Sequence, residues 1–239
     1  MNKLNEAILY AAQMHSGQLR KGTNLPYIVH PMEVLNILTR MNAHEELLMA
    51  GVLHDVVEDT DATIEDIAAR FGDTVAELVN AHTEQHKDLP WWERKLKSIE
   101  HLRTAPRDVK LLILADKLSN IRSMAADHAR IGDKLWERFC ADKTMQSRYY
   151  SMSIDALGDM ANDPDAKWAY WELNNLYKEV FVDFYIDEQR VMLIQKCCHG
   201  ETYYFPKCDD AWYELPGQFN LTPITRKEAE FIEDVWKYV

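Results

Sequence analysis

Apolar residues recur at helical spacing almost without interruption from Leu4 to about Phe181, and the spacing then changes. A repeat of about 3.6 residues indicates amphipathic helices that bury one face against each other. Beyond Phe181, the stretches 190–195, 201–205 and 211–215 are typical of short strands, with a turn at His199-Gly200 between the first two. The sequence therefore predicts an all-helical body, residues 1–181, followed by a small α+β unit, residues 182–239.

Glycine residues and capping motifs within this pattern predict where individual elements begin and end. Gly17 and Gly72 follow apolar-periodic runs as stop signals, and Thr225-Arg226-Lys227-Glu228 is a capping box that precedes a helix. We expect helices at about residues 4–15, 31–38, 45–58, 63–71, 73–82, 91–102, from 108 onward, 133–160, 164–181 and 229–238. The C-terminal unit then has the order β-β-β-α.

Charge and composition exclude several classes of protein. The 239 residues include 39 acidic and 27 basic side chains, giving a formal net charge of −12. Nonspecific nucleic-acid binding relies on Lys and Arg, so we expect no nucleic-acid partner. No apolar stretch approaches the roughly 18 residues that span a bilayer, and we expect no membrane partner. The N-terminus lacks the pattern of a signal peptide and the four cysteines lack that of a secreted framework, so we expect the cytoplasm.

The segment Leu53-His54-Asp55-Val56-Val57-Glu58-Asp59-Thr60 carries the strongest chemical signal. It follows an apolar run that predicts a buried helix, yet it places four titratable side chains together. Burying ionisable groups is costly unless they pair or bind a metal. On a continuous helix, Glu58 shares a face with His54 and with Asp55. A metal site and a solvated helix end are both compatible with this segment alone.

Two further positions complete a candidate ligand set. Tyr27-Ile28-Val29-His30-Pro31 places a histidine at the start of a helix, and Asp116 interrupts the hydrophobic run 111–118. Each has an ordinary structural explanation, such as an ion pair between Asp116 and Lys117. Together with His54 and Asp55 they offer two imidazoles and two carboxylates, which suit Mn²⁺, Fe²⁺ or Zn²⁺, with Mn²⁺ favoured by the oxygen ligands.

These residues, in this order, resemble the metal-binding pattern of the HD phosphohydrolase superfamily. Four motifs narrow the resemblance to the hydrolase domain of RelA/SpoT homologues: GQLRKG at 17–22, PYIVHP at 26–31, LHDVVEDT at 53–60 and LADKLSNIR at 114–122. The resemblance covers roughly residues 4–160, and no synthetase domain is recognisable, as in a stand-alone small alarmone hydrolase. It implies an all-α HD-domain fold and Mn²⁺-dependent removal of the 3′-pyrophosphate from guanosine tetra- or pentaphosphate.

The resemblance also implies a role for each matched residue. It makes His30, His54, Asp55 and Asp116 the metal ligands, and Glu58 and Asp59 the acidic pair that handles the attacking water. Substrate-binding residues would be Arg20, Lys21, Asn120 and Ser123. Gly22 departs from relatives with a polar residue at that position, so the choice between guanine and adenine stays open.

Other interpretations fit the same residues. The substrate could be an adenosine analogue or the 2′-phosphate of NADPH, since only the base contacts would differ. The chain could instead be an antitoxin-like partner that binds an alarmone synthetase, and a homo-oligomer is also compatible with the sequence. His82, His86, His101 and His128 are expected on helix surfaces or in local hydrogen bonds. The aromatic residues of the C-terminal unit fit either its own core or a partner surface: Tyr203, Tyr204, Phe205, Trp212, Tyr213 and Trp236.

Overall fold

The computed structural model describes residues 2–84, 87–187, 192–198, 202–206, 213–214 and 222–236. Its α-helices are α1 (Lys3–Met14), α2 (Val29–Arg40), α3 (Glu45–Leu53), α4 (Val56–Asp59), α5 (Ile64–Phe71), α6 (Asp73–His82), α7 (Trp91–Thr104), α8 (Arg107–Ile131), α9 (Lys143–Ala156), α10 (Lys167–Phe181) and α11 (Arg226–Trp236). Two 3₁₀ helices, η1 (Gly132–Arg138) and η2 (Gly158–Asn162), flank α9. The strands are β1 (Val182–Asp187), β2 (Met192–Cys197), β3 (Thr202–Pro206), β4 (Tyr213–Glu214) and β5 (Thr222–Ile224).

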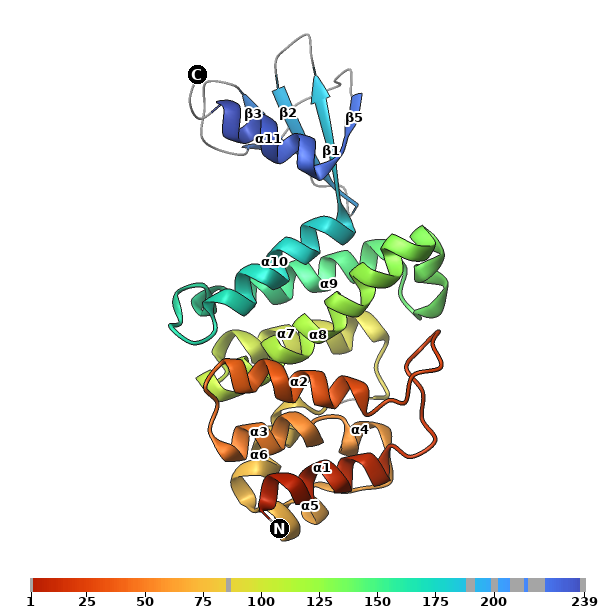
Figure 1. The fold of residues 1–239 in the computed structure, drawn as a ribbon, viewed down its shortest axis with the longest axis vertical. Helices are drawn as coiled ribbons and strands as arrows, with labels where there is room; N and C mark the ends of the chain where they lie inside the picture. Colours follow the sequence, from red (N-terminus) through yellow and green to blue (C-terminus); the bar gives the residue numbers. More distant parts are fainter. Residues whose placement is uncertain are drawn as a thin grey trace.

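Helix α8 is the centre of the helical body. It packs against α2, α3, α6 and α10, and the sheet lies beyond α10, at the end of the molecule opposite the N-terminus (Figure 1). Leu111, Leu114 and Leu118 are completely buried on α8, as the apolar run predicted. Asp116 lies on the same helix, within this core. An acid there is surrounded by packed helices on several sides, so its carboxylate depends on partners from those helices.

Two of the expected helices are interrupted. The helix expected over 45–58 ends at Leu53 and resumes as α4, with His54 and Asp55 between them. The helix expected over 133–160 is wrong as a single element: only Lys143–Ala156 is α-helical, between η1 and η2. The Asp142 carboxylate accepts a hydrogen bond from the Met145 backbone N–H at 2.8 Å, which starts α9 at that point. This N-cap separates α9 from the segment before it.

The sheet contains two strands that the sequence pattern did not predict. Its order is β4-β3-β2-β1-β5, with every described pair antiparallel. The predicted α+β unit is confirmed, but β1 continues directly from α10, and β5 adds three residues at the far edge. Pro223 in β5 is typical of an edge strand, because proline cannot donate a ladder hydrogen bond. The turn expected at His199-Gly200 lies outside the described residues.

Specific polar contacts join the sheet to the helices. The Tyr177 hydroxyl on α10 lies 2.9 Å from Cys197 Sγ on β2, and the Ser147 hydroxyl on α9 lies 3.1 Å from that of Tyr177. The predicted capping box is present, since the Glu228 carboxylate accepts from the Thr225 backbone N–H at 2.7 Å. The side chains of the six aromatic residues singled out above lie outside those that the structure describes.

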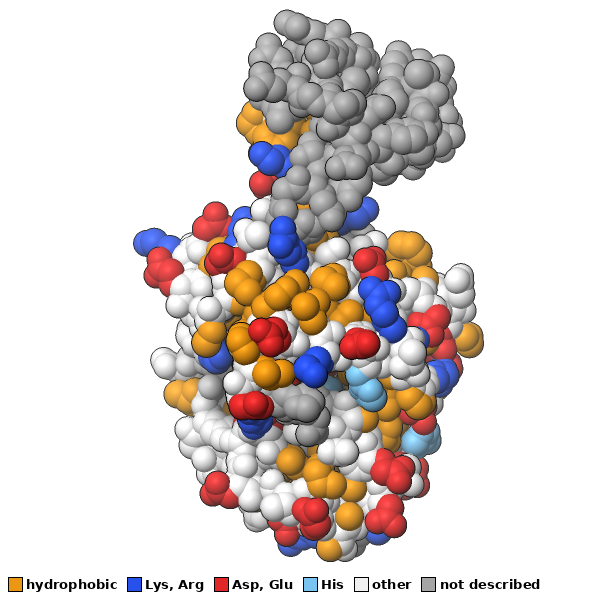
Figure 2. All heavy atoms as spheres, turned by 180° about the vertical axis from the view of Figure 1, so that it is seen from behind, with side chains coloured by type: hydrophobic (Ala, Val, Ile, Leu, Met, Phe, Trp, Pro, Cys, Tyr) orange, Lys and Arg blue, Asp and Glu red, His pale blue; other side chains and the backbone are white. Residues whose placement is uncertain are grey.

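Figure 2 shows one face, on which Lys and Arg side chains are scattered among acidic and hydrophobic ones over the coloured part of the chain. Within the described residues, no helix combines the length and the apolar character needed to cross a bilayer.

Candidate metal centre and adjoining cavity

Two neighbouring side chains of the candidate site lie at the break between α3 and α4. His54 ends α3 and its Nδ1 donates to the Gly51 carbonyl at 2.8 Å. Asp55 precedes α4, and its Oδ2 accepts the Tyr27 hydroxyl at 2.6 Å. The prediction that Glu58 shares a face with His54 and Asp55 on one continuous helix is therefore wrong. The break instead allows adjacent residues to point at one centre.

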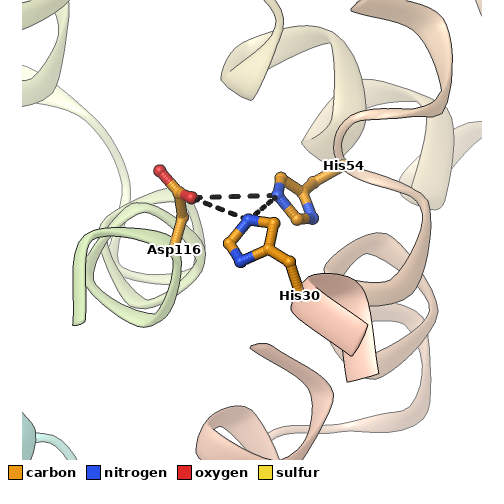
Figure 3. A group of neighbouring side chains, drawn as sticks. All are labelled: His30, His54 and Asp116. Carbon is orange, nitrogen blue, oxygen red and sulfur yellow. Dashed lines mark hydrogen bonds and ion pairs between the residues drawn. The ribbon is translucent and has the colours of Figure 1, made fainter. Parts of the chain in front are cut away.

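The other two predicted ligands come from helices that face this break. His30 lies in the first turn of α2 and Asp116 lies in the middle of α8. Asp116 Oδ1 is 3.2 Å from His30 Nε2 and 3.9 Å from His54 Nε2. His30 Nε2 and His54 Nε2 are 3.2 Å apart, and Figure 3 shows the three groups converging. Asp55 Oδ2 joins them at 3.0 Å from His54 Nε2 and 3.6 Å from His30 Nε2.

The spacing and chemistry of this group fit a divalent cation. Ligand atoms that bind one ion at about 2.1 Å lie about 3.0–3.5 Å from each other, close to the spacing found here. Because His54 Nδ1 donates its proton to a carbonyl, the neutral form of the His54 ring points a lone pair at His30 Nε2. His30, His54 and Asp116 also form a compact buried group of metal-ligating atoms, all within 4.8 Å of one another. A cation at this position would satisfy nitrogen and oxygen atoms that otherwise repel each other.

The electrostatics of the group keep both carboxylates ionised. Burial raises the pKa of Asp116, but the Lys117 ammonium and the neighbouring His30 and His82 rings outweigh it and hold that pKa well below its usual value. Burial lowers the pKa of His30. Burial also lowers the pKa of His54, but the Asp55 carboxylate outweighs it and raises that pKa to about 9. A proton and a cation therefore compete for His54 Nε2.

The predicted acidic pair lies on α4, beside the ligand group. Glu58 and Asp59 both line a cavity of about 710 Å³ that also opens onto His30, Asp55 and Asp116. Glu58 Oε2 accepts the Glu84 backbone N–H at 3.2 Å, which fixes its direction. Partial desolvation at the cavity wall and then the Asp55 carboxylate raise the pKa of Asp59, although the residue keeps an exposed surface. A carboxylate with a raised pKa is suited to accepting a proton near neutral pH.

Three of the four predicted substrate residues lie together. An Arg20 guanidinium nitrogen is 3.2 Å from both Asn120 Oδ1 and Ser123 Oγ, and it also lies over the Tyr27 ring. Asn120 Nδ2 donates to Asp116 Oδ1 at 2.6 Å, which connects this group to the candidate ligands. Lys21 stands apart, because its side chain is exposed and forms no hydrogen bond or ion pair with any residue that the structure describes.

The cavity also has a basic wall, whose residues the sequence analysis did not identify. Arg94, Lys97 and His101 are spaced three and four residues apart on α7, so they share one face, and Lys95 and Lys117 also line the cavity. Glu84 pairs with Arg94 and with Lys95, the latter at 2.7 Å. The helical spacing of these cations was the available signal. The cavity is thus lined by both acids and cations.

His82 is a correction to the expected surface histidines. Its side chain is 11% exposed, its Nε2 lies 3.6 Å from Asp116 Oδ2, and its ring packs on His54 at 4.7 Å between centroids. His128, in contrast, forms the expected local contact, with Asp133.

Comparison with known proteins agrees with this site. A family model described as "HD domain" matches residues 7–143. The chain is 40% identical over 124 residues to the guanosine-3′,5′-bis(diphosphate) 3′-pyrophosphohydrolase MESH1 of Danio rerio, covering 51% of this chain and 68% of that one. It is 37% identical over 132 residues to the bifunctional (p)ppGpp synthase/hydrolase SpoT of Escherichia coli, covering 53% of this chain and 18% of SpoT. The solved structure of a metazoan orthologue of SpoT that hydrolyses ppGpp matches with a TM-score of 0.61 and 31% identity, covering 75% of this chain and 96% of that one.

These matches confirm the resemblance inferred from the four motifs, and the chain belongs to the HD-domain family. Relatives that are 40% and 38% identical to it, over 124 and 129 residues, are named guanosine-3′,5′-bis(diphosphate) 3′-pyrophosphohydrolase. The chain spans less than a quarter of the long curated relatives that it matches, namely 22% of the GTP pyrophosphokinase of Myxococcus xanthus and 18% of SpoT.

Proposed function

We propose that this chain hydrolyses the 3′-pyrophosphate of guanosine tetra- and pentaphosphate, giving GDP or GTP and pyrophosphate, with Mn²⁺ as its cofactor and the cytoplasm as its compartment. The convergence of His30, His54 and Asp116 beside a cavity that is lined by Glu58 and Asp59 supports this function most directly. A site with metal-ligating groups, an acid pair and a cationic wall suits hydrolysis of a phosphate ester or anhydride.

Each group of residues has a distinct task in this reaction. His30, His54, Asp55 and Asp116 would hold the ion, which when bound lowers the pKa of a water and polarises a phosphoryl oxygen. Asp59, whose raised pKa suits it to take up a proton, receives the proton of the attacking water on its carboxylate, and Glu58 orients that water. Arg20, Asn120 and Ser123 hold the nucleotide, Arg20 by stacking or by hydrogen bonds. The cations of α7 balance phosphate charge that an acidic protein otherwise repels.

The competing functions differ in measurable ways. An adenosine analogue or NADPH would use the same ligands and acid pair and change only the contacts to the base. An antitoxin-like partner of an alarmone synthetase would have no need of Glu58 and Asp59 beside the ligands. Relatives named as ppGpp hydrolases favour the guanosine substrate.

A substrate screen tests the proposal. Purified protein loaded with Mn²⁺ should release pyrophosphate from guanosine tetra- and pentaphosphate faster than it releases pyrophosphate or phosphate from the adenosine counterparts or NADPH. Product separation by anion-exchange chromatography checks this. Faster turnover of NADPH or of the adenosine compounds would contradict the guanosine assignment, and no turnover of any of them would contradict the enzymatic function.

We also propose that residues 1–181 form the catalytic domain and residues 182–239 an appended unit. The matched motifs all lie at or before Ser123, and β1 begins where α10 ends. A chain ending at Asp183 should bind metal and keep the reaction, with lower stability because the contacts of Cys197 to Tyr177 and Ser147 are lost. Thermal unfolding and turnover of this shortened chain check both parts. If it folds and binds metal but has lost all turnover, the division is wrong.

A further inference from the structure

A series of hydrogen bonds leads away from His30 on the side opposite the ligand group, buried at Ser119 and partly exposed at Glu33 and Arg122. His30 and Glu33 are three residues apart on α2, and they face Ser119 and Arg122, three residues apart on α8. His30 Nδ1 lies 2.9 Å from Ser119 Oγ, and the Ser119 hydroxyl donates to Glu33 Oε2 at 2.9 Å. Ser119 is fully buried, so water does not compete for its hydroxyl.

The far end of this series is charged. Arg122 donates to Glu33 Oε1 at 3.3 Å and to Glu172 of α10 at 2.7 Å. The guanidinium stabilises the negative charge on Glu33, which can then only accept hydrogen bonds. The donor and acceptor of each hydrogen bond in this series follow from the charge on Glu33, because a serine hydroxyl has only one proton to donate.

We propose that Ser119 and Glu33 are positioning residues that fix the ring proton of His30 on Nδ1 and so keep Nε2 free for the metal. Because Ser119 gives its proton to Glu33, it can only accept from His30, and Nδ1 must donate. The Nε2 lone pair then faces His54 Nε2 at 3.2 Å and Asp116 Oδ1 at 3.2 Å. His54 also carries a proton on Nδ1, but there the acceptor is the Gly51 carbonyl. This inference rests on the proposed metal site, but not on the identity of the nucleotide.

Two substitutions interrupt the series at different points. Ser119→Ala leaves His30 Nδ1 without an acceptor. Glu33→Gln keeps the size of the side chain, but the Arg122 cation draws the amide oxygen and leaves the NH₂ group facing Ser119. The hydroxyl must then accept from the amide and donate to His30, which moves the ring proton to Nε2. Loss of an outer hydrogen-bond partner typically weakens metal binding about 10- to 100-fold.

Matched controls separate this effect from general damage. Ser147→Ala removes another fully buried hydroxyl, on α9, where it contacts Tyr177. Glu172→Gln removes a carboxylate from Arg122 but leaves the bond between Glu33 and Ser119 in place. Both should leave Mn²⁺ affinity and the His30 tautomer unchanged.

The experiment measures Mn²⁺ binding to the full chain by titration calorimetry, and the His30 tautomer by ¹⁵N NMR of the metal-free protein. We expect Nδ1–H in the wild type, Nε2–H in Glu33→Gln, and weaker Mn²⁺ binding in both Ser119→Ala and Glu33→Gln. Nε2–H in the wild type, which needs no variant to observe, overturns the inference, as do variants that bind Mn²⁺ as tightly as the wild type. A wild type that binds Mn²⁺ but hydrolyses no nucleotide contradicts the proposed function alone.

Discussion

Replacing His54 with Ala should abolish both metal binding and turnover. His54 Nε2 lies within 3.2 Å of His30 Nε2 and 3.0 Å of Asp55 Oδ2, so its loss removes one nitrogen ligand from the centre of the group. A bound divalent ion supplies several kcal/mol of transition-state stabilisation, so we expect turnover to fall by at least about 10³-fold. Elemental analysis of the purified protein and a pyrophosphate-release assay measure the two effects separately.

Asp116→Ala should have the same outcome for a second reason. Its Oδ1 faces His30 while its Oδ2 lies 3.0 Å from Lys117 Nζ, so the substitution also leaves a buried ammonium without its carboxylate. Circular dichroism must therefore show that each variant is folded. His128→Ala, which removes a histidine outside the cavity, is the control and should keep metal and activity. Active protein without any transition metal would contradict the assignment of this site.

Much of the helical body was predictable because its helices carry their own signals. Apolar periodicity and local caps located α1, α5 and α6. The capping box at Thr225 indicated α11, but that helix begins at Arg226, three residues before the predicted start at Ala229. The break at His54 and Asp55 was not predictable, because it depends on partners distant in sequence. Asp55 is held by Tyr27, and its neighbour His54 packs against His30 and His82. Periodicity along one helix contains no information about those contacts.

The candidate site was predictable to the extent that a charged residue in an apolar run is unusual. His30, His54 and Asp116 each place a titratable side chain within or next to an apolar stretch, and the structure brings them together. His82 gave no such signal, because the end of a helix is an ordinary place for a histidine. The sequence pattern also gave no sign of a role for Ser119 and Glu33. A serine and a glutamate are ordinary residues on helices, and these two come into contact only because α2 packs against α8. Residues whose role depends on contacts between distant helices can be identified only from the three-dimensional structure.

The acid pair should matter for the reaction and not for the metal. In the double variant Glu58→Gln with Asp59→Asn, both side chains keep their size but neither can accept a proton from water. General-base catalysis contributes about 10²–10⁴-fold, and we expect turnover to fall by that factor. Metal content should be unchanged, because the group at His30, His54 and Asp116 is complete without either residue.

The two single variants separate the roles within the pair. Asp59→Asn should account for most of the loss, because the pKa of Asp59 is raised by burial and by Asp55, as a base near neutral pH requires. Glu58→Gln should cost less, since the amide oxygen can still accept the Glu84 backbone N–H that now holds the carboxylate. Single-turnover rates at saturating nucleotide, measured with metal content on the same samples, test the order. Near-native turnover in the double variant would contradict this assignment, because another titratable side chain of the cavity would then have to accept the proton from water.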